Sequence, residues 1–173
     1  MAAPDLIVLE RDRDLAGREW EAWVRRGLFA LLCLVPLLAL LNVFGQRPET
    51  ASAAAPEAKL ALYAPEHVRS GLLFEARFRV TARQDLAKAT LVLDPGWLEG
   101  MQANTIEPGP IGEGSADGKL VFQLGHVAAG HSYVLFMQFQ VDPTNVGRRS
   151  QGVALYDGQR KLVELHRTIT VYP

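Results

Sequence analysis

Phe74-Glu75-Ala76-Arg77-Phe78-Arg79-Val80-Thr81-Ala82-Arg83 decides the fold, because apolar and polar side chains alternate along this stretch with a period of two. Successive side chains of a β-strand point to opposite faces, so the alternation predicts a strand with one buried and one solvated face. A slip of one residue would bury three arginines, and the register of this strand is therefore fixed.

Four further stretches alternate in the same way: 89–93, 120–124, 133–141 and 163–171. The last one is interrupted at Arg167, which predicts a bulge or an edge position there. Turn-forming residues predict loops at 94–96, 107–110 and 112–118, and a hairpin turn at Asp157-Gly158. Roughly seven short strands without a helical period predict an all-β, immunoglobulin-like β-sandwich over residues 59–173.

Residues 118–143 carry a resemblance to a known family. They read GKLVFQLGHVAAG followed by HSYVLFMQFQVDP, in which a strand ending in Leu124-Gly125 leads to Ala-Ala-Gly130 and a long alternating strand. This arrangement resembles the repeat-type immunoglobulin-like domains of bacterial cell-surface proteins. The Asn-x-Gly that follows the opening strand in that family is missing, since residues 82–86 are Ala-Arg-Gln-Asp-Leu. The resemblance implies a structural or adhesive envelope module, with no catalytic residues to transfer.

Residues 27–46, GLFALLCLVPLLALLNVFGQ, contain eight leucines and no charged residue. A helix of this length is about 30 Å long, which matches the hydrocarbon core of a bilayer. We therefore predict one transmembrane α-helix, with a kink at Pro36. Trp20, Trp23, Arg25 and Arg26 come just before it, where aromatic and basic side chains favour the membrane interface.

Basic residues predict the orientation of this helix, because lysine and arginine resist translocation. Five arginines lie in residues 1–26, whereas Arg47 and Lys59 are the nearest basic residues that follow. We expect a single-pass protein of the cell membrane, with segment 1–26 in the cytoplasm, a linker at 47–58 and the β-domain outside. A cleaved signal peptide is the alternative, because Ala51-Ser52-Ala53 and Ala53-Ala54-Ala55 have the small residues of a cleavage site.

Composition argues against several functions. The chain has 18 basic and 19 acidic residues, which does not favour a nucleic-acid partner. Its single cysteine, Cys33, lies in the apolar block, so the β-domain has neither a disulfide nor a thiolate metal site. His126 and His131 flank one turn and could meet at a metal, but the four histidines lack the local spacing of a ligand set. No nucleophile stands in a recognised frame, and we expect no enzyme activity, cofactor or small-molecule substrate.

Arg77, Arg79 and Arg83 share the polar face of the first strand, which has two interpretations. One is a solvated sheet face with weak ion pairs, and the other is a contact surface for a partner subunit, anionic headgroups or a wall polymer. Trp97 is either a core residue or an exposed binding anchor. We expect a non-enzymatic accessory subunit whose domain packs on a membrane protein. The alternative is an adhesive module that recognises a cell-wall glycan or lipid.

Overall fold

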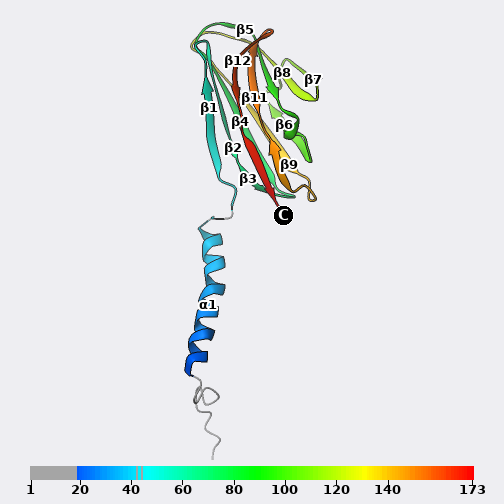
Figure 1. Ribbon diagram of the computed structural model, residues 1–173. Coiled ribbons are helices and arrows are strands. Elements are labelled where there is room, and N and C mark those ends of the chain that lie inside the picture. The colour runs from blue at the N-terminus through cyan, green and yellow to red at the C-terminus, as the bar shows by residue number, and fades with distance from the viewer. Residues whose placement is uncertain (1–18, 42, 44) are drawn as a thin grey trace, which may run out of the picture. The chain divides into compact units, whose positions relative to one another are not determined.

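The computed structural model describes residues 19–41, 43 and 45–173. They belong to two compact units, residues up to 44 and residues 45–173. The first contains helix α1 and the second contains all the strands (Figure 1). Most of the predicted cytoplasmic segment, residues 1–18, lies outside the described residues.

Helix α1 spans Glu19–Leu40 and includes Pro36. It begins and ends earlier than the predicted range of 27–46, because the glutamate, alanine and arginine residues before Gly27 favour helix and extend it toward the N-terminus. From Trp20 to Leu40 the helix is long and apolar enough to cross a membrane, and a signal sequence can meet the same criteria of length and apolarity.

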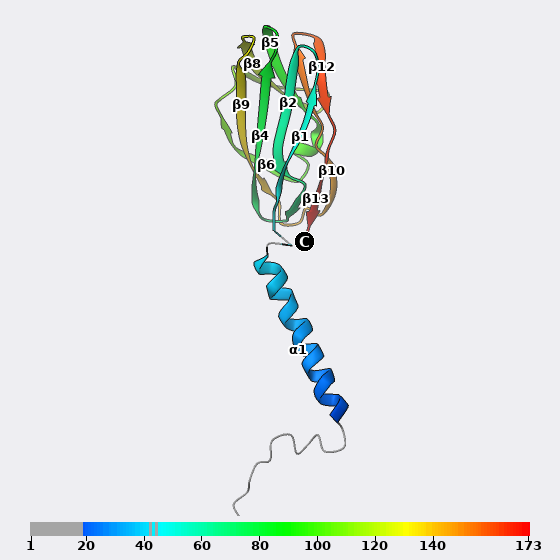
Figure 2. The ribbon, with the colours of Figure 1, turned by 90° about the vertical axis from the view of Figure 1, so that its left-hand side faces the viewer.

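The second unit is a β-sandwich (Figures 1 and 2). One antiparallel sheet has the order β1 (Pro48–Ala54), β2 (Ala58–Pro65), β4 (Leu73–Ala82), β9 (Ser132–Val141) and β6 (Met101–Glu107). The other has the order β12 (Arg160–Leu165), β11 (Val153–Asp157), β5 (Leu86–Leu93), β8 (Lys119–Val127) and β7 (Gly112–Ala116). A small third sheet contains β10 (Gly147–Ser150), β13 (Thr168–Tyr172) and β3 (His67–Arg69).

The strand order identifies the type of sandwich. Strands β2, β4, β9 and β6 follow the A-B-E-D order of an immunoglobulin sheet, and β5, β11 and β12 follow the C-F-G order of the facing sheet. The hairpin of β7 and β8 is added beside β5, and β1 is added beside β2. The predicted all-β, immunoglobulin-like sandwich is therefore confirmed.

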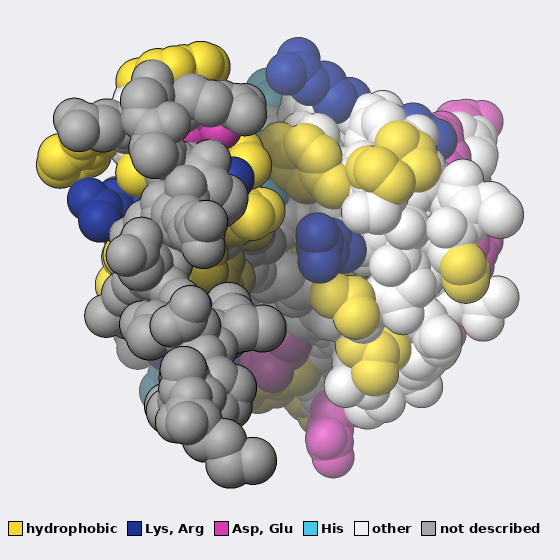
Figure 3. Space-filling model, turned by 90° about the horizontal axis from the view of Figure 1, so that it is seen from below, with side chains coloured by type: hydrophobic (Ala, Val, Ile, Leu, Met, Phe, Trp, Pro, Cys, Tyr) yellow, Lys and Arg dark blue, Asp and Glu magenta, His cyan; other side chains and the backbone are white. Residues whose placement is uncertain are grey.

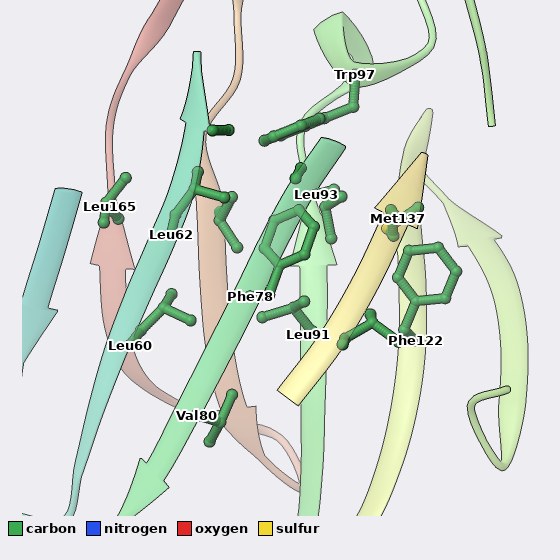
Figure 4. Close-up of a cluster of buried hydrophobic side chains, with 14 of the residues drawn as sticks. Leu60, Leu62, Phe78, Val80, Leu91, Leu93, Trp97, Phe122, Met137 and Leu165 are labelled. Atoms are coloured by element: carbon green, nitrogen blue, oxygen red, sulfur yellow. The ribbon is translucent and has the colours of Figure 1, made fainter. Parts of the chain in front are cut away.

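The core lies between the two large sheets and follows the predicted alternation (Figure 4). Every apolar residue of β4 that was expected to face inward is buried: Phe74, Ala76, Phe78, Val80 and Ala82. The largest buried side chain is Trp97, in the short 3-10 helix η2 (Pro95–Trp97). Its ring centroid lies 5.2 Å from that of Phe78 and 5.2 Å from that of Phe139.

The linker predicted at residues 47–58 is wrong for most of its length. Strand β1 pairs with β2 from Pro48 opposite Pro65 to Ala54 opposite Lys59. Ala51 and Ala53 pack against the core, because alternate methyl groups allow the strand to lie close to the sandwich. A run of alanines shows little contrast between its two faces, so the period of two was not visible in the sequence.

The glycine-rich stretch 112–118, predicted as a loop, is also a strand with its turn. Strand β7 pairs with β8 from Gly112 opposite Gln123 to Ala116 opposite Lys119. Asp117 and Gly118 connect them with φ angles of 52° and 74°, as a type I′ hairpin turn requires. Backbone pairing with β8 forms this strand without any large apolar side chain.

Arg167 lies neither in a bulge nor in an edge strand. It occupies the connection where the chain passes from β12 to β13, and so from one sheet to another. The buried guanidinium donates hydrogen bonds to the Ala64 carbonyl at 3.3 Å and to the Pro65 carbonyl at 2.7 Å. Burial lowers the pKa of Arg167, and the charges of Glu66 and Glu49 oppose that shift.

Candidate functional site

One row of side chains crosses the outer surface of the first sheet. The register places Thr50, Tyr63, Arg77, Phe136 and Glu107 opposite one another on β1, β2, β4, β9 and β6. Neighbours across strands lie close enough for their side chains to interact. We call the outward side chains around this row the β4 face: Tyr63, Glu75, Arg77, Arg79, Glu107 and Phe136.

Arg77 is the centre of the β4 face. Its guanidinium carbon lies 5.5 Å from the ring centroid of Tyr63 and 4.8 Å from that of Phe136. The guanidinium also donates a hydrogen bond from Nη2 to Glu75 Oε1, at 3.2 Å. Its Nε is covered and has no hydrogen-bond partner among the described residues. Two cation–π contacts and one ion pair therefore hold this side chain in a fixed orientation.

The aromatic residues beside Arg77 remain accessible to a partner. Tyr63 is 39% exposed and Phe136 is 38% exposed, although each packs against the arginine. Protein interfaces are enriched in aromatic residues and arginine relative to the rest of a protein surface. The β4 face has this composition.

A shallow, open depression adjoins the row. It has a volume of about 350 Å³ and is lined by Glu75, Thr105, Glu107, Phe136, Met137 and Gln138. The Phe136 ring offers an apolar contact, and the two glutamates offer negative charge. A side chain with an apolar stem and a cationic end, lysine or arginine, matches this lining.

The three predicted arginines do not lie on one surface. Arg79 is exposed on the β4 face beside Ala61 and Val134, and it forms no ion pair among the residues that the structure describes. Arg83 lies past the end of β4, where its Nη1 donates to the Ala55 carbonyl at 3.2 Å. The structure therefore brings Arg77 and Arg79 together and separates Arg83 from them.

Trp97 was also a candidate for the interaction surface, as an exposed binding anchor, and that interpretation is wrong. The side chain has no exposed surface. Its indole N–H donates to the Gly152 carbonyl at 3.2 Å, so the polar end of the ring is satisfied inside the core. Trp97 is a packing residue.

Two members of the site, Tyr63 and Phe136, were not predicted from the sequence. Phe136 faces solvent, because the odd-numbered positions of stretch 133–141 face the core. Tyr63 is likewise the exposed member of an inward-facing run that includes Leu60 and Leu62. A large aromatic residue on the solvent phase of a strand was the available signal.

The predicted membrane-interface residues all belong to the first turns of α1. Trp20 and Trp23 are exposed, and the guanidinium carbon of Arg26 lies 5.2 Å from the Trp23 ring centroid. Arg25 is exposed as well. Their contact with a membrane interface stays a prediction.

The histidines around the 128–131 turn have separate partners. His126 Nε2 lies 2.9 Å from Asp85 Oδ1, and both side chains are largely exposed. His131 Nδ1 lies 3.3 Å from the Ala129 carbonyl oxygen. Across residues 19–41, 43 and 45–173, no group of three or more histidine, cysteine or carboxylate side chains could hold a metal ion.

The comparisons with known proteins concern the fold. No protein-family model matches the chain, and no curated protein matches it. The resemblance of 118–143 to repeat-type domains of bacterial surface proteins therefore stays a prediction.

Among solved structures, a non-cellulosomal cohesin from Archaeoglobus fulgidus has 11% identity and a TM-score of 0.41, covering 64% of this chain and 88% of that one. The CARDB domain of a Pyrococcus furiosus protein, in complex with di-metal ions, has 15% identity and a TM-score of 0.38, covering 73% and 94%. The C-terminal domain of wzt has 15% identity and a TM-score of 0.38, covering 75% and 81%. These values are too low to transfer a ligand or an activity, and the strand order alone establishes the immunoglobulin-like sandwich.

Proposed function

We propose that this protein is a non-enzymatic, membrane-anchored interaction subunit. Helix α1 is the anchor, and the β4 face of the sandwich contacts a protein partner in the same membrane. The observation that carries the proposal is Arg77, held between two half-exposed aromatic rings on an open sheet face. A preorganised arginine flanked by aromatic residues resembles the hot spots of protein interfaces, where a few such residues supply most of the binding energy.

The anchor is supported by the length and surface of α1. Its 22 residues make a helix of about 33 Å, enough to cross a hydrocarbon core. Large apolar side chains such as Phe29 and Leu31 are exposed on it. Water-soluble surfaces rarely carry a continuous apolar patch of this kind, and a bilayer would cover it.

The position of strand β1 argues against the alternative of a cleaved signal peptide. Both candidate cleavage sites fall at residues 51–55, within or just after β1. Cleavage there would remove the strand that pairs with β2 and would uncover the core beneath Ala51 and Ala53. Retention of the helix preserves the sandwich edge, and this supports an anchor over a leader.

A protein partner suits the β4 face better than a wall glycan. Sugar-binding sites commonly use an open aromatic platform, but the Arg77 guanidinium lies over both the Tyr63 and the Phe136 rings. Trp97, the other aromatic residue considered for such a platform, is buried. Recognition of a wall glycan therefore has no supporting observation among the described residues.

Site-specific photocrosslinking tests the partner surface. The full chain is produced in its native cell with p-benzoylphenylalanine in place of Phe136, and in a second sample in place of Tyr156 on β11 of the opposite sheet. After irradiation, position 136 should yield an adduct with a membrane protein, and position 156 should yield none. Absence of an adduct at 136, or the same adduct at both positions, would contradict the proposed surface.

Three arginine variants give a matched control. Arg77→Ala and Arg79→Ala alter the β4 face, whereas Arg83→Ala makes the same chemical change outside it. The first two should lower recovery of the crosslinked partner, and the third should leave it unchanged. Equal recovery for all three would show that the β4 face does not bind the partner.

The anchor is tested independently. Resistance of the full chain to extraction from membranes at alkaline pH, together with an intact mass that includes residues 19–54, is expected. Release into the soluble fraction, or a mature chain beginning near Ala54, would overturn the anchor.

A further inference from the structure

Exposed apolar side chains are unevenly distributed over the two ends of the sandwich. The end where the chain enters β1 carries Leu72, Leu73, Val146 and Tyr172, which are 47%, 48%, 49% and 48% exposed. The opposite end is formed by the turns near residues 55–57, 83–85, 128–131 and 157–160. None of these four turns contains an exposed large apolar residue. Figure 3 shows the first end, where hydrophobic side chains lie beside basic ones.

Backbone hydrogen bonds fix the apolar residues at this end. Between β3 and β4, the N–H of Gly71 donates to the Val141 carbonyl at 3.0 Å, and the N–H of Val141 donates to the Leu72 carbonyl at 3.0 Å. The N–H of Ser70 donates to the Tyr172 carbonyl at 2.8 Å. The turn is therefore well ordered by pairing, and the two adjacent leucines protrude from it.

Tyr172 and Val146 continue the apolar surface. Tyr172 lies opposite Arg69 in the parallel pairing of β13 and β3, and its ring stacks on His67 with centroids 5.8 Å apart. Gly147, the residue after Val146, pairs with Val171, the residue before Tyr172. We call Leu72, Leu73, Val146 and Tyr172, with the basic residues Arg69 and Arg148, the tether-end patch.

Two basic side chains of the tether-end patch have no intramolecular counter-ion. Arg69 and Arg148 are exposed and form no ion pair within the described part of the chain. Nearby carboxylates have other cationic neighbours: Glu49 and Glu66 act on Arg167, and Glu99 lies 3.5 Å from the Arg149 Nε. The patch therefore combines apolar side chains, a tyrosine and unneutralised positive charge.

The covalent chain limits how far this end can lie from the apolar segment. The apolar sequence ends at Phe44, and β1 begins at Pro48. Four residue steps span at most about 14 Å when fully extended. The polar layer of a bilayer adds about 5 to 8 Å on each side of the hydrocarbon core. The connection is thus short enough for the tether-end patch to reach the headgroups, and too short for a large gap.

We propose that the tether-end patch lies in the headgroup layer of the bilayer that holds α1, so that the sandwich rests on the membrane through a second contact. This inference depends on the proposed anchor. Leu72 and Leu73 enter the interface, Tyr172 takes the position that aromatic residues favour there, and Arg69 and Arg148 meet anionic headgroups. Contact at this end would restrict the tilt of the domain and present the β4 face sideways to a partner in the membrane.

A fluorescent probe in the reconstituted full chain tests the contact. Cys33→Ser removes the native thiol, and Ser70→Cys or Ser132→Cys then accepts a nitrobenzoxadiazole label at the tether end or at the start of β9. The labelled chains are placed in nanodiscs of phosphatidylcholine and phosphatidylglycerol that contain a headgroup-nitroxide lipid. The probe at 70 should be quenched several-fold more strongly than the probe at 132.

Variants separate the apolar and electrostatic contributions. Leu72→Ser with Leu73→Ser should clearly reduce quenching at position 70, although the short connection between Phe44 and Pro48 keeps it above the level of position 132. The melting temperature should stay unchanged, because both side chains are half exposed. Arg69→Gln with Arg148→Gln leaves the apolar residues intact, and it should weaken quenching only in discs that contain the anionic lipid.

The results distinguish this inference from the proposed anchor. A chain that resists alkaline extraction, but whose quenching at 70 is the same with and without Leu72→Ser and Leu73→Ser, overturns the headgroup contact and leaves the anchor in place. A chain that alkaline treatment extracts overturns both. Quenching at 70 that occurs only in discs with two copies would assign the patch to self-association and would also overturn the headgroup contact.

Discussion

The Trp97 indole N–H and the Asp94 backbone N–H both donate to the Gly152 carbonyl, at 3.2 and 3.0 Å. The relationship between Trp97 and Gly152 joins η2 to the start of β11 across 55 residues of sequence. It places the largest buried ring between Phe78 and Phe139 of the first sheet. One tryptophan thus connects both sheets.

Removal of the Trp97 ring should therefore strongly destabilise the sandwich. We expect Trp97→Ala to lower the free energy of unfolding by about 3 to 5 kcal/mol, the usual effect of deleting a buried large aromatic side chain. Trp97→Phe keeps part of the packing and loses the hydrogen bond, so it should cost clearly less. Guanidinium unfolding of the detergent-solubilised full chain, followed by circular dichroism, measures both. Equal losses for the two variants would contradict the role of ring packing.

The close approach of η2 to β10 predicts a strict requirement for glycine at position 96. A Cβ atom there would overlap the backbone carbonyl of Ser150, which cannot move away as a side chain could. We expect Gly96→Ala to lower the melting temperature by several degrees. Gly114→Ala is the matched control, since a Cβ at 114 meets no atom within 4 Å. Similar melting temperatures for the two variants would refute the close contact.

Arg167 should contribute to stability through its hydrogen bonds to the end of β2. Arg167→Met retains an apolar stem but removes the donors to the Ala64 and Pro65 carbonyls. Because hydrogen bonds to charged groups are worth about 1.5 to 3 kcal/mol, we expect a loss of about 2 to 3 kcal/mol. Arg167→Lys should retain only part of this stability, because a single ammonium group cannot reproduce the two parallel N–H donors of a guanidinium. Equilibrium unfolding compares the three chains.

The ion pair of Lys161 and Glu164 on β12 predicts that the stability of the fold depends slightly on pH. Lys161 Nζ lies 2.7 Å from Glu164 Oε2, and this hydrogen bond lowers the pKa of Glu164 below its ordinary value. A carboxyl group with a lowered folded pKa stabilises the fold above the unfolded pKa, and the contribution is lost as the pH falls through the folded pKa. The wild type should therefore melt slightly higher than Lys161→Gln at pH 7. The difference should vanish once Glu164 is protonated. A difference that persists unchanged in acid would contradict the pairing.

Strands with strong contrast between their faces were predictable from the sequence. In β4 the buried apolar residues alternate mostly with charged ones, and in the second half of β9 they alternate with Gln138 and Gln140, so a single register buries the apolar set. Strands β1 and β7 were missed because alanine, serine and glycine differ little in the free energy of burial. Their pairing depends on the backbone edges that β2 and β8 offer.

The candidate site depended on tertiary structure even where its residues were noticed. Arg77 was recognised as an outward side chain, but its contacts with Tyr63 and Phe136 arise from strands far apart in the sequence. Arg83, only four residues beyond Arg79, lies outside the β4 face because β4 ends at Ala82. Trp97 could not be assigned from its loop-like surroundings, since the core that encloses it comes from other strands.

The sequence by itself determined the two-part organisation of this protein, an apolar helix followed by a β-sandwich, because continuous apolarity and a period of two are local patterns. Tertiary structure alone decided which strands became neighbours, and with them the Tyr63–Arg77–Phe136 row and the clustering of Leu72 with Tyr172. Strand pairing joins residues that are distant along the chain, and its register is set by the shared core of all the strands, which no single stretch encodes.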